Sequence, residues 1–466
     1  MIVSGTKWEE ELKRAGRSKY KALAQAIREG ISSGQLPAGH RLPPVRELAH
    51  KAGMTPGTVA RAYTLLTDEG RLTAEVGRGT FVAKTHLPPR TEVEPLINHP
   101  NDTIADFRSS RVPDVGQGVS IDQAFIRLGQ THRRRHINYP TQQTDLEART
   151  ATAGWLDQDR LGGVVADDVI LGNGAQNCCL LALQAVLRGN NPVILTEDLS
   201  YPGVRHAARL LRAQIVGLPI DEEGIIPEAF EQAYRAHGGQ VLLTAAEVHS
   251  PTTIQTSLAR KQALAAIARK LNVTIIEDDC HTTAPTDIPS YRAMLPEHAN
   301  VVSSITKSVS GALRFGYVIA PSREAKVLRQ VAQSSFYGVA QPILDVCTDL
   351  LTNGAAAEIR DKVVVETTRR VRLAVNKLGA WDVRWREDAP FVFLQMPVGW
   401  RASGFAMACE KKGILVKPAD EFALPNGMAP NAVRLGLNTC VNEQLFLGAM
   451  DNMNALLSNP HSLVDN

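Results

Sequence analysis

Helical periodicity of the apolar residues dominates the first part of the chain. It predicts an amphipathic helix over residues 19–33 and, after the Gly- and Pro-rich stretch "GQLPAGHRLP", a short helix over about 44–52. A third helix is expected to begin after Thr55, a favourable N-cap residue, with Pro56 in its first turn, where a missing N–H leaves nothing unpaired. Gly70 is expected to end this helix.

The pattern then changes from helix to strand. Residues 71–83, "RLTAEVGRGTFVA", indicate two strands around a Gly-Arg-Gly turn. A helix, a helix–turn–helix and a hairpin in this order predict a winged helix-turn-helix domain over residues 1–83. Residues 84–104 are polar, contain proline and lack periodicity, so we interpret them as a linker.

From residue 105 onwards, short apolar runs alternate with helical stretches, which predicts an α/β fold. The runs "VILG", "VILT", "VLLT", "TIIE" and "NVVSS" end in polar residues and are typical of buried parallel strands. Ligands of parallel sheets gather outside the carboxyl ends of the strands. The candidates for one shared site are therefore the polar residues that follow these runs: Asn173, Gly174, Ala175, Gln176, Tyr201, Ser250, Asp278 and Lys307.

Lys307 suggests the chemistry of this cluster. A lysine buried at a strand end has a lowered pKa, and its neutral amine can form a Schiff base with an aldehyde. Ser304 and Arg314 in the same loop suit a phosphate group, which the start of the helix at "NGAQ" also favours. Asp278 can keep a pyridine nitrogen protonated, and Tyr201 can stack on the ring. The cofactor that these groups describe is pyridoxal 5′-phosphate.

Each of these features also has a simpler interpretation. A lysine after a strand is usually a solvated surface charge, "EDD" at a strand end is often a cap, and "NGAQ" alone is a common turn. Their joint occurrence, in the right order and on successive strand ends, favours the cofactor site.

Charge is distributed unevenly along the 466 residues. Residues 1–83 contain 13 Lys and Arg against 8 Asp and Glu, a net charge of +5, and the rest of the chain holds 38 against 40, a net charge of −2. A basic terminal domain favours a polyanionic partner, although a solvated basic face would have the same composition.

Composition argues against a membrane or secreted protein. No apolar run approaches the roughly 20 residues that a membrane-spanning helix needs. The segment "MIVSGTKWEEELKR" has no apolar signal core, and the six cysteines form no CxxC pair. We therefore expect a reduced, cytoplasmic protein with no membrane partner and no metal site.

The amino-terminal pattern has a known counterpart. "LPAGHRLPPVRELAHKAGMTPGTVARAYTLLTDEGRLTAEVGRGTFV" resembles the DNA-binding domain of the GntR family of bacterial regulators, and the match covers residues 20–82. The resemblance implies that the third helix enters the major groove of double-stranded DNA. The residues that it implies for base readout are Thr55, Gly57 and Thr58. Those implied for phosphate contacts are Arg41, Arg46 and Arg61, with Arg78 at the wing tip. Family members often carry arginine in place of Pro56, so base readout here is expected to use other residues.

The body resembles the fold-type I aminotransferases from about residue 105 to 457, with a small-domain part at about 360–457 and a tail at 458–466. The motifs that match are "ILGNGAQNCCLLAL", "EDLSYPG", "IIEDDC" and, most specific of all, "SSITKSVSGALRFGYVIAP". The resemblance implies that Lys307 is the Schiff-base lysine, that Asp278 is the pyridinium partner and that Arg434 binds a substrate carboxylate. It assigns the other cofactor contacts to Gly174, Ala175, Gln176, Tyr201, Ser304 and Arg314. It also implies a homodimer.

Three departures from the aminotransferase pattern qualify this chemistry. His281 stands where the family usually has a tyrosine that hydrogen-bonds the cofactor's phenolic oxygen, and an imidazole titrates near neutrality; an ordinary loop histidine is the simpler interpretation. Ser250 and Thr253 replace the usual asparagine and glycine in "VHSPTTIQ", and "QQTDLEAR" lacks the glycine of "G-x-x-x-L-R". The site is expected to bind the cofactor, with Ser250 and His281 among its contacts, without being tuned for rapid turnover.

A GntR-type head joined to an aminotransferase-like body is the plan of the MocR-like regulators. The favoured hypothesis is a transcriptional regulator that senses pyridoxal 5′-phosphate or an amino compound bound to it. One alternative is an active aminotransferase with an attached DNA-binding domain, which the complete winged helix and the altered cofactor surroundings disfavour. The other is a DNA-binding protein whose body only dimerises, which the presence of Lys307, Asp278 and Arg314 disfavours.

Overall fold

The computed structural model describes residues 19–68, 71–75, 79–83, 104–131, 136–424, 427–439 and 442–459. The chain divides into two compact units, Met1–Pro95 and Leu96–Asn466. None of the helices within the described ranges is long and apolar enough to cross a membrane.

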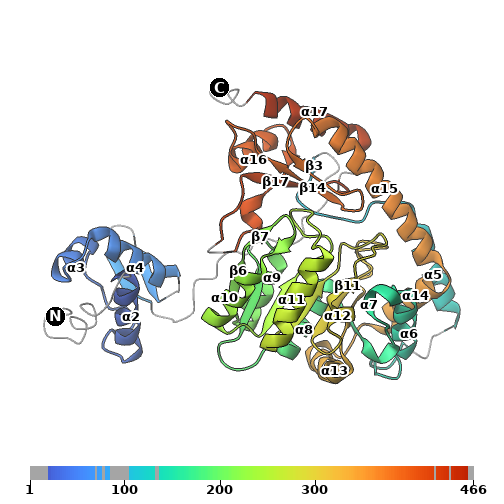
Figure 1. The fold of residues 1–466 in the computed structure, drawn as a ribbon, viewed down its shortest axis with the longest axis horizontal. Helices are drawn as coiled ribbons and strands as arrows, with labels where there is room; N and C mark the ends of the chain where they lie inside the picture. Colours follow the sequence, from blue (N-terminus) through green and yellow to red (C-terminus); the bar gives the residue numbers. More distant parts are fainter. Residues whose placement is uncertain are drawn as a thin grey trace. The chain divides into compact units, whose positions relative to one another are not determined.

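The described residues of the first unit form helices followed by a β-hairpin, drawn in blue in Figure 1. The elements are α2 (Lys19–Ser32), α3 (Val45–Lys51), α4 (Pro56–Asp68), β1 (Leu72–Glu75) and β2 (Gly79–Val82). Their apolar stripes meet in one core, whose most deeply buried members include Leu23, Ile27, Val59 and Leu66. This arrangement confirms the predicted winged helix.

Thr55 begins the third helix as the sequence predicts. Its Oγ1 accepts a hydrogen bond from the N–H of Thr58 at 3.3 Å, which pairs one of the free amides of the first turn. Pro56 is the first residue of α4. The predicted end of this helix at Gly70 lies outside the described residues.

The second unit is built on a seven-stranded sheet with the order β4-β12-β11-β10-β9-β5-β6. Neighbouring strands are parallel except around β12, which runs antiparallel to both β11 and β4. The five runs that the sequence predicts as strands therefore point in one direction, and their carboxyl ends lie at one edge. The strands are β4 (Val169–Gly172), β5 (Val193–Glu197), β6 (Gln214–Leu218), β9 (Val241–Thr244), β10 (Thr274–Asp278), β11 (Ala299–Ser304) and β12 (Gly316–Ile319).

Helices pack on this sheet in two apolar layers. One layer combines α8 (Ala175–Val186), α9 (Pro202–Leu211) and α13 (Ser322–Phe336) with the sheet. The other contains α10 (Pro227–His237), α11 (Leu258–Leu271) and α12 (Tyr291–Met294). Both faces of the strands are therefore apolar, which explains their near-continuous hydrophobic runs.

A third cluster surrounds the strands β4 and β12 at one end of the sheet. It contains α5 (Gln117–Thr131), α6 (Leu146–Trp155) and α14 (Gln341–Thr352). The short helices α7 (Gln158–Leu161) and η1 (Ala166–Asp168) complete this part of the unit. The hairpin of β7 (Ile220–Asp221) and β8 (Gly224–Ile225) packs instead in the layer that contains α10.

The long helix α15 (Ala355–Leu378) leads from the large sheet to a smaller domain (Figure 1). There, an antiparallel sheet has the order β13-β14-β17-β16, with strands β13 (Val383–Arg384), β14 (Phe391–Gln395), β16 (Lys417–Pro418) and β17 (Ala432–Gly436). The remaining elements are α16 (Ala402–Glu410), β15 (Ile414–Leu415), η2 (Ala419–Phe422) and α17 (Glu443–Ser458).

The chain enters the second unit through this small domain. Strand β3 (Ala105–Asp106) pairs in parallel with β15, far away in sequence. Residues 107–116 then lead to α5 beside the large sheet. The segment after the predicted linker therefore touches the small domain before it reaches the large one.

Buried ion pairs fix the loop beyond β10. Both Nη atoms of Arg160 donate to the Asp279 carboxylate, at 2.7 and 2.8 Å, in the two-pronged geometry that suits a guanidinium. Lys261 on α11 donates to Glu277 at 3.0 Å. Because a buried charge without its partner is costly, these pairs hold the residues on either side of Asp278 in place.

Candidate functional site

The common strand direction brings the predicted site residues to one edge of the sheet. Lys307 follows β11, Asp278 is the last residue of β10, and Gly174 follows β4. Tyr201 and Ser250 lie beyond β5 and β9 in the same way. The edge therefore collects residues that are more than 130 positions apart in the sequence, from 174 to 307.

Lys307 lies partly buried in the turn after β11. Its Nζ donates a hydrogen bond to the backbone carbonyl of Ser110. Burial lowers the pKa of Lys307 to about 8, and the positive charges of Arg434 and Arg111 act in the same direction, whereas Cys280 and Asp278 oppose the shift. An amine with this pKa is neutral often enough near pH 8 to act as a nucleophile.

Asp278 presents a carboxylate near this amine. Its Oδ1 accepts a hydrogen bond from the backbone N–H of Cys280 at 3.2 Å. Burial raises its pKa, and the hydrogen bonds of Cys280 oppose that shift. A carboxylate at this place can accept a hydrogen bond from a protonated ring nitrogen, as the sequence suggests.

A cradle for an anion forms where β4 and β12 meet. Gly174 has a positive φ of 79°, and a Cβ there would lie 2.7 Å from Cζ of Arg314. A Cβ at Gly316 would lie 2.7 Å from Cα of Gly174. Only glycines allow these approaches, which place the exposed Arg314 guanidinium beside the first turn of α8 at Ala175, with Nη2 3.1 Å from the carbonyl of Asn173. Helix-start amides and a guanidinium together suit a phosphate.

Two other residues that the sequence predicts to contact the cofactor form hydrogen bonds within the protein. Gln176 Nε2 donates to the carbonyl of Gly203 at 3.0 Å and so ties α8 to the start of α9. Ser304 Oγ accepts a hydrogen bond from the N–H of Thr306 at 3.3 Å. Tyr201 stands at the N-cap of α9, where burial, followed by the negative charge of Asp278, raises the pKa of its phenol to about 12.

Arg434 reaches the same site from strand β17 of the small domain. It is 5% exposed, and its Nη1 and Nη2 donate to Ser250 Oγ at 3.1 Å and to the carbonyl of Arg108 at 2.6 Å. Its Nε is buried and has no partner among the described residues. Rings of Phe422 and Phe391 lie 4.7 and 5.4 Å from its Cζ. Burial lowers its pKa to about 10, so it remains a cation at neutral pH.

His281 lies beside the two cations of the site, Lys307 and Arg434. Burial, assisted by the positive charges of Lys307 and Arg434, holds its pKa well below the ordinary value of 6.5. Its ring packs edge-on against Phe391 with centroids 5.2 Å apart, and its Nδ1 is buried without a partner in the described part of the chain. A neutral imidazole with an unpaired nitrogen can still exchange a hydrogen bond with a ligand.

The structure adds residues that the motifs do not reveal. Residues 107–111 run through the site, where the carbonyls of Arg108 and Ser110 meet Arg434 and Lys307. The small domain contributes Phe391 and Phe422 beside Arg434. Main-chain atoms bring no side-chain signature, so only the polar stretch "RSSR" after Phe107 could have drawn attention to this segment.

These groups fit pyridoxal 5′-phosphate. They offer an amine, a carboxylate, an anion cradle and an aromatic side chain, which are the partners of an aldehyde, a ring nitrogen, a phosphate and a ring face. Several buried polar atoms of the site, among them His281 Nδ1, Arg434 Nε and Ser110 Oγ, lack a partner within the described chain. Unpaired buried groups of this kind indicate space for a polar ligand.

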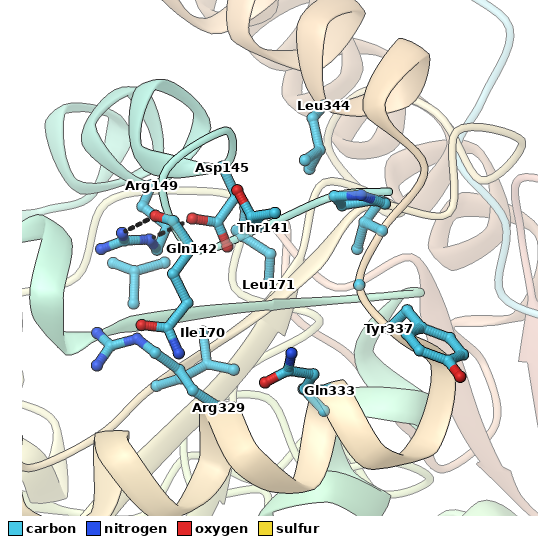
Figure 2. A pocket seen from close by; sticks show the side chains of 15 residues that line it. Thr141, Gln142, Asp145, Arg149, Ile170, Leu171, Arg329, Gln333, Tyr337 and Leu344 are labelled. Carbon is cyan, nitrogen blue, oxygen red and sulfur yellow. Dashed lines mark hydrogen bonds and ion pairs between the residues drawn. The ribbon is translucent and has the colours of Figure 1, made fainter. Parts of the chain in front are cut away.

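A separate pocket of about 190 Å³ lies along β4, between α6 and α13 (Figure 2). Its lining combines the apolar Ile170, Leu171 and Leu344 with the polar side chains of Arg329 and Gln333. It contains none of the predicted site residues. We assign the chemistry to the Lys307 site because the nucleophile, the carboxylate and the anion cradle meet there.

The predicted DNA-contacting residues that the structure describes lie on α4 and just before it, on α3, and beside strand β2, where Arg41 pairs with Phe81. The Oγ1 atoms of Thr55 and Thr58 are 2.9 Å apart, and Thr55 and Gly57 are exposed. Arg61 is exposed, and its guanidinium lies over the ring of Tyr20 at 4.4 Å. The other described basic residues of this set are exposed as well: Arg41 and Arg46. Arg78 lies outside the described residues.

The lowered pKa of Lys307 predicts how capture of pyridoxal 5′-phosphate depends on pH. The amine is protonated below its pKa of about 8 and free above it, so the capture rate should rise as the pH increases through that value. Arg434→Met removes a nearby positive charge, so the midpoint should move to higher pH. Stopped-flow absorbance at several pH values measures both midpoints; a wild-type midpoint at the ordinary lysine value of 10.5 would contradict the assignment.

Comparison with known proteins agrees with this geometry. The family model for bacterial regulatory proteins of the gntR family matches residues 19–82, and that for class I and II aminotransferases matches residues 114–445. Both expected resemblances are thus confirmed.

The relatives with the same plan are regulators. The vitamin B6 salvage pathway transcriptional repressor PtsJ of Salmonella typhimurium is 26% identical, over 93% of this chain and 97% of its own. The HTH-type transcriptional regulator TauR of Rhodobacter capsulatus is 25% identical, over 90% of this chain and 92% of its own. The HTH-type pyridoxine biosynthesis transcriptional regulator PdxR of Corynebacterium glutamicum is 27% identical, over 66% of this chain and 67% of its own.

Solved structures share the fold of the body. The α-aminoadipate aminotransferase LysN from Thermus thermophilus superimposes with a TM-score of 0.68 at 20% identity, and the match covers 78% of this chain and 94% of that one. An archaeal alanine:glyoxylate aminotransferase gives a TM-score of 0.69 at 19% identity, with 76% and 91% covered. The chain therefore belongs to the class I and II aminotransferase family and, with its GntR-type amino-terminal domain, to the MocR-like transcriptional regulators.

Proposed function

We propose that this regulator binds pyridoxal 5′-phosphate covalently through Lys307 and senses the cofactor, or an amino compound bound to it, to control transcription. The observation that supports this most directly is the position of an amine of lowered pKa between the Asp278 carboxylate and the anion cradle at Gly174 and Arg314. Two relatives are named for pyridoxine biosynthesis and vitamin B6 salvage, which supports the same cofactor.

Each residue has a proposed role toward the cofactor. Lys307 would hold its aldehyde and Asp278 its ring nitrogen, while Tyr201 would cover the ring. The phosphate would lie on the start of α8, held by Gly174, Ala175, Ser304 and Arg314. Gln176 and Ser250 act by fixing Gly203 and Arg434, with which they already bond. When bound, the cofactor supplies an electrophilic carbon that can take up an amine.

Arg434 suggests the class of effector. A buried guanidinium with an unpaired Nε favours a carboxylate, and Lys307 lies near the place where an amine would react. A ligand with both an amine and an acid, such as an amino acid, suits the two groups. The alternative is that the cofactor alone is the signal. Titrating amino acids against the visible absorbance of the loaded protein separates these cases, because an amine-bearing effector would shift the band.

An active aminotransferase is the second candidate function. Membership of the aminotransferase family and the retained Lys307 and Arg434 favour it. The neutral His281 in place of a phenol, and the strained Thr253 with φ of 65° where glycine is usual, disfavour rapid turnover. Sustained conversion of an amino acid and a keto acid by the loaded protein would support this candidate over sensing.

The body is also proposed to form a homodimer. Tyr139, Tyr337 and Ile137 are 76%, 67% and 80% exposed, and the two tyrosine rings pack with centroids 5.4 Å apart. Ile126 on α5 is also 62% exposed. Grouped apolar side chains of this size usually mark an interaction surface. A DNA-binding dimer also implies a cytoplasmic protein with two half-sites on its operator.

The test of the cofactor site is chemical trapping at Lys307. Purified protein loaded with pyridoxal 5′-phosphate should absorb in the visible, and borohydride should remove the band and fix the cofactor mass on Lys307. Lys307→Ala should lose the band while keeping the circular dichroism of the wild type. Lys270→Ala, which removes an exposed lysine paired with Glu231, is the matched control. Peptide mass spectrometry that places the reduced adduct on another lysine would refute the assignment.

DNA affinity should fall steeply with salt, because the basic head displaces counterions from phosphates. Arg41→Ala and Arg46→Ala should each weaken binding to all sequences and lower the slope of log affinity against log salt by about one. Thr58→Ala should instead change sequence preference, since its side chain lies at the start of α4. Fluorescence anisotropy with operator and scrambled duplexes separates these effects. If Arg46→Ala changed the sequence preference and left the overall affinity unchanged, the assignment of the arginines to phosphates and of Thr58 to bases would be refuted.

The dimer predicts a mass of twice 50.6 kDa in solution. Tyr139→Ser with Tyr337→Ser should weaken association, because the apolar surface loses its two aromatic rings. Trp385→Ser, which changes a 42% exposed aromatic residue of the small domain, is the control. Sedimentation equilibrium at micromolar concentration measures the outcome, and a wild-type monomer would contradict the proposal.

A further inference from the structure

Residues 107–111, termed the strap, make a row of main-chain contacts with the site. The carbonyl of Phe107 accepts from the N–H of Gly436 at 2.7 Å, and that of Arg108 accepts from Arg434 Nη2 at 2.6 Å. The next two carbonyls, of Ser109 and Ser110, accept from Thr439 Oγ1 at 2.6 Å and from Lys307 Nζ. Four successive carbonyls of the strap therefore hold donors of the small domain and the site.

The contact with Arg434 uses a donor that a ligand needs. A carboxylate that binds a guanidinium side-on takes the Nε–H and the neighbouring Nη2–H together. In the structure Nε is buried and has no partner among the described residues, whereas Nη2 is held by Arg108. The strap therefore already takes one of the two N–H groups of Nη2. A carboxylate bound to Nε and Nη2 would bring a second oxygen acceptor close to the carbonyl of Arg108, and repulsion between the two acceptors favours a carbonyl that has moved away.

The contact with Lys307 has the same character. The ammonium group donates to the carbonyl of Ser110, and this bond cannot persist unchanged once the nitrogen is joined to a carbon of the cofactor. Ser110 also has a buried hydroxyl without a partner among the described residues. The strap therefore offers neutral dipoles to the buried Arg434 and the partly buried Lys307, which an anionic ligand would pair better.

The strap is held from both ends. Upstream, Asp106 accepts from Nε and Nη2 of Arg108, both at 3.0 Å, and the N–H of Phe107 donates to Leu415 at 2.7 Å. Downstream, Thr439 holds Ser109, and Gly436 lies so close that a Cβ there would be 2.7 Å from the carbonyl carbon of Ser109. These contacts do not involve the ligand site, so they determine how much free energy is needed to move the strap out of the site.

We propose that the strap is a resident competitor of the ligand, and that binding of the cofactor at Lys307 and of a carboxylate at Arg434 displaces it from the site. The proposal rests on the proposed function of this site. The strap follows strand β3 directly, and the chain before β3 leads to the winged helix. Its displacement is thus a movement in the segment next to β3, where the chain from the winged helix enters the second unit, and along this route ligand binding reaches the DNA-binding domain.

The first test weakens the strap without touching the ligand. Thr439→Val keeps the side-chain shape and removes the hydroxyl that holds Ser109. If the strap competes, the full-length variant should bind pyridoxal 5′-phosphate about 2- to 10-fold more tightly, which is the net effect of one hydrogen bond. Thr152→Val is the matched control, since its buried hydroxyl donates to Ala148 within α6 at 2.7 Å, and its affinity should equal that of the wild type.

The second test follows the strap itself by hydrogen exchange. Pyridoxal 5′-phosphate should accelerate exchange at the amide of Gly436, which the carbonyl of Phe107 protects, and acetate added to the loaded protein should accelerate it further. A merely structural strap would show unchanged or slower exchange. Gly436→Ala, whose Cβ would press on Ser109, should raise cofactor affinity in the same direction as Thr439→Val.

The outcomes separate the two proposals. A wild-type protein that shows no visible band with pyridoxal 5′-phosphate would refute the proposed function. A normal band, with Thr439→Val binding no more tightly than Thr152→Val, would refute only the strap as a competitor. Exchange that speeds up with the cofactor and not with acetate would remove Arg434 from the proposal and confine displacement to Lys307.

Discussion

Two cations that donate to main-chain carbonyls, the partly buried Lys307 and the buried Arg434, set the character of the second unit. Lys307 comes from the large sheet and Arg434 from the small one, and their hydrogen bonds within the described chain go to main-chain carbonyls and one hydroxyl. Removing a cation from water costs free energy that dipoles offset only in part. Burial lowers the pKa values of Lys307 and His281, and the positive charge of Arg434 acts in the same direction on both. A ligand that brings anions is the natural completion of this centre.

The antiparallel strand β12 explains how the anion cradle is built. Because β12 runs antiparallel to β4, its first residues lie beside the last residues of β4. Arg314, just before β12, therefore lies at the carboxyl end of β4, where α8 begins. The facing pair of Gly316 and Gly172 belongs to this register, and Gly316 also approaches Gly174 closely. A side chain at Gly174 would push the guanidinium away, and one at Gly316 or Gly172 would press on the backbone of Gly174 or on the side chains of Cys178 and Asn177. The cradle therefore depends on strand direction and on absent side chains as much as on the arginine.

The sequence predicts the elements better than it predicts the centre between them. Apolar periodicity and Thr55 locate the helices of the head, and the apolar runs locate five strands whose ends meet as expected. The sequence does not reveal the carbonyls of residues 107–111, because main-chain atoms leave no trace in residue identity. The pKa of His281 could not be inferred either, since it depends on burial and on charges from Lys307 and Arg434, which are distant in sequence.

Strand β3 has a consequence for the order of assembly. Its partner β15 lies roughly 300 residues later in the chain, so during synthesis β3 waits unpaired until almost the whole body has been made. Contacts between such distant segments close long loops and form late in folding. The contacts of the winged helix, in contrast, span fewer than 70 residues and can form as soon as the head emerges. Strand β3 is thus among the last parts of the second unit to reach its native pairing.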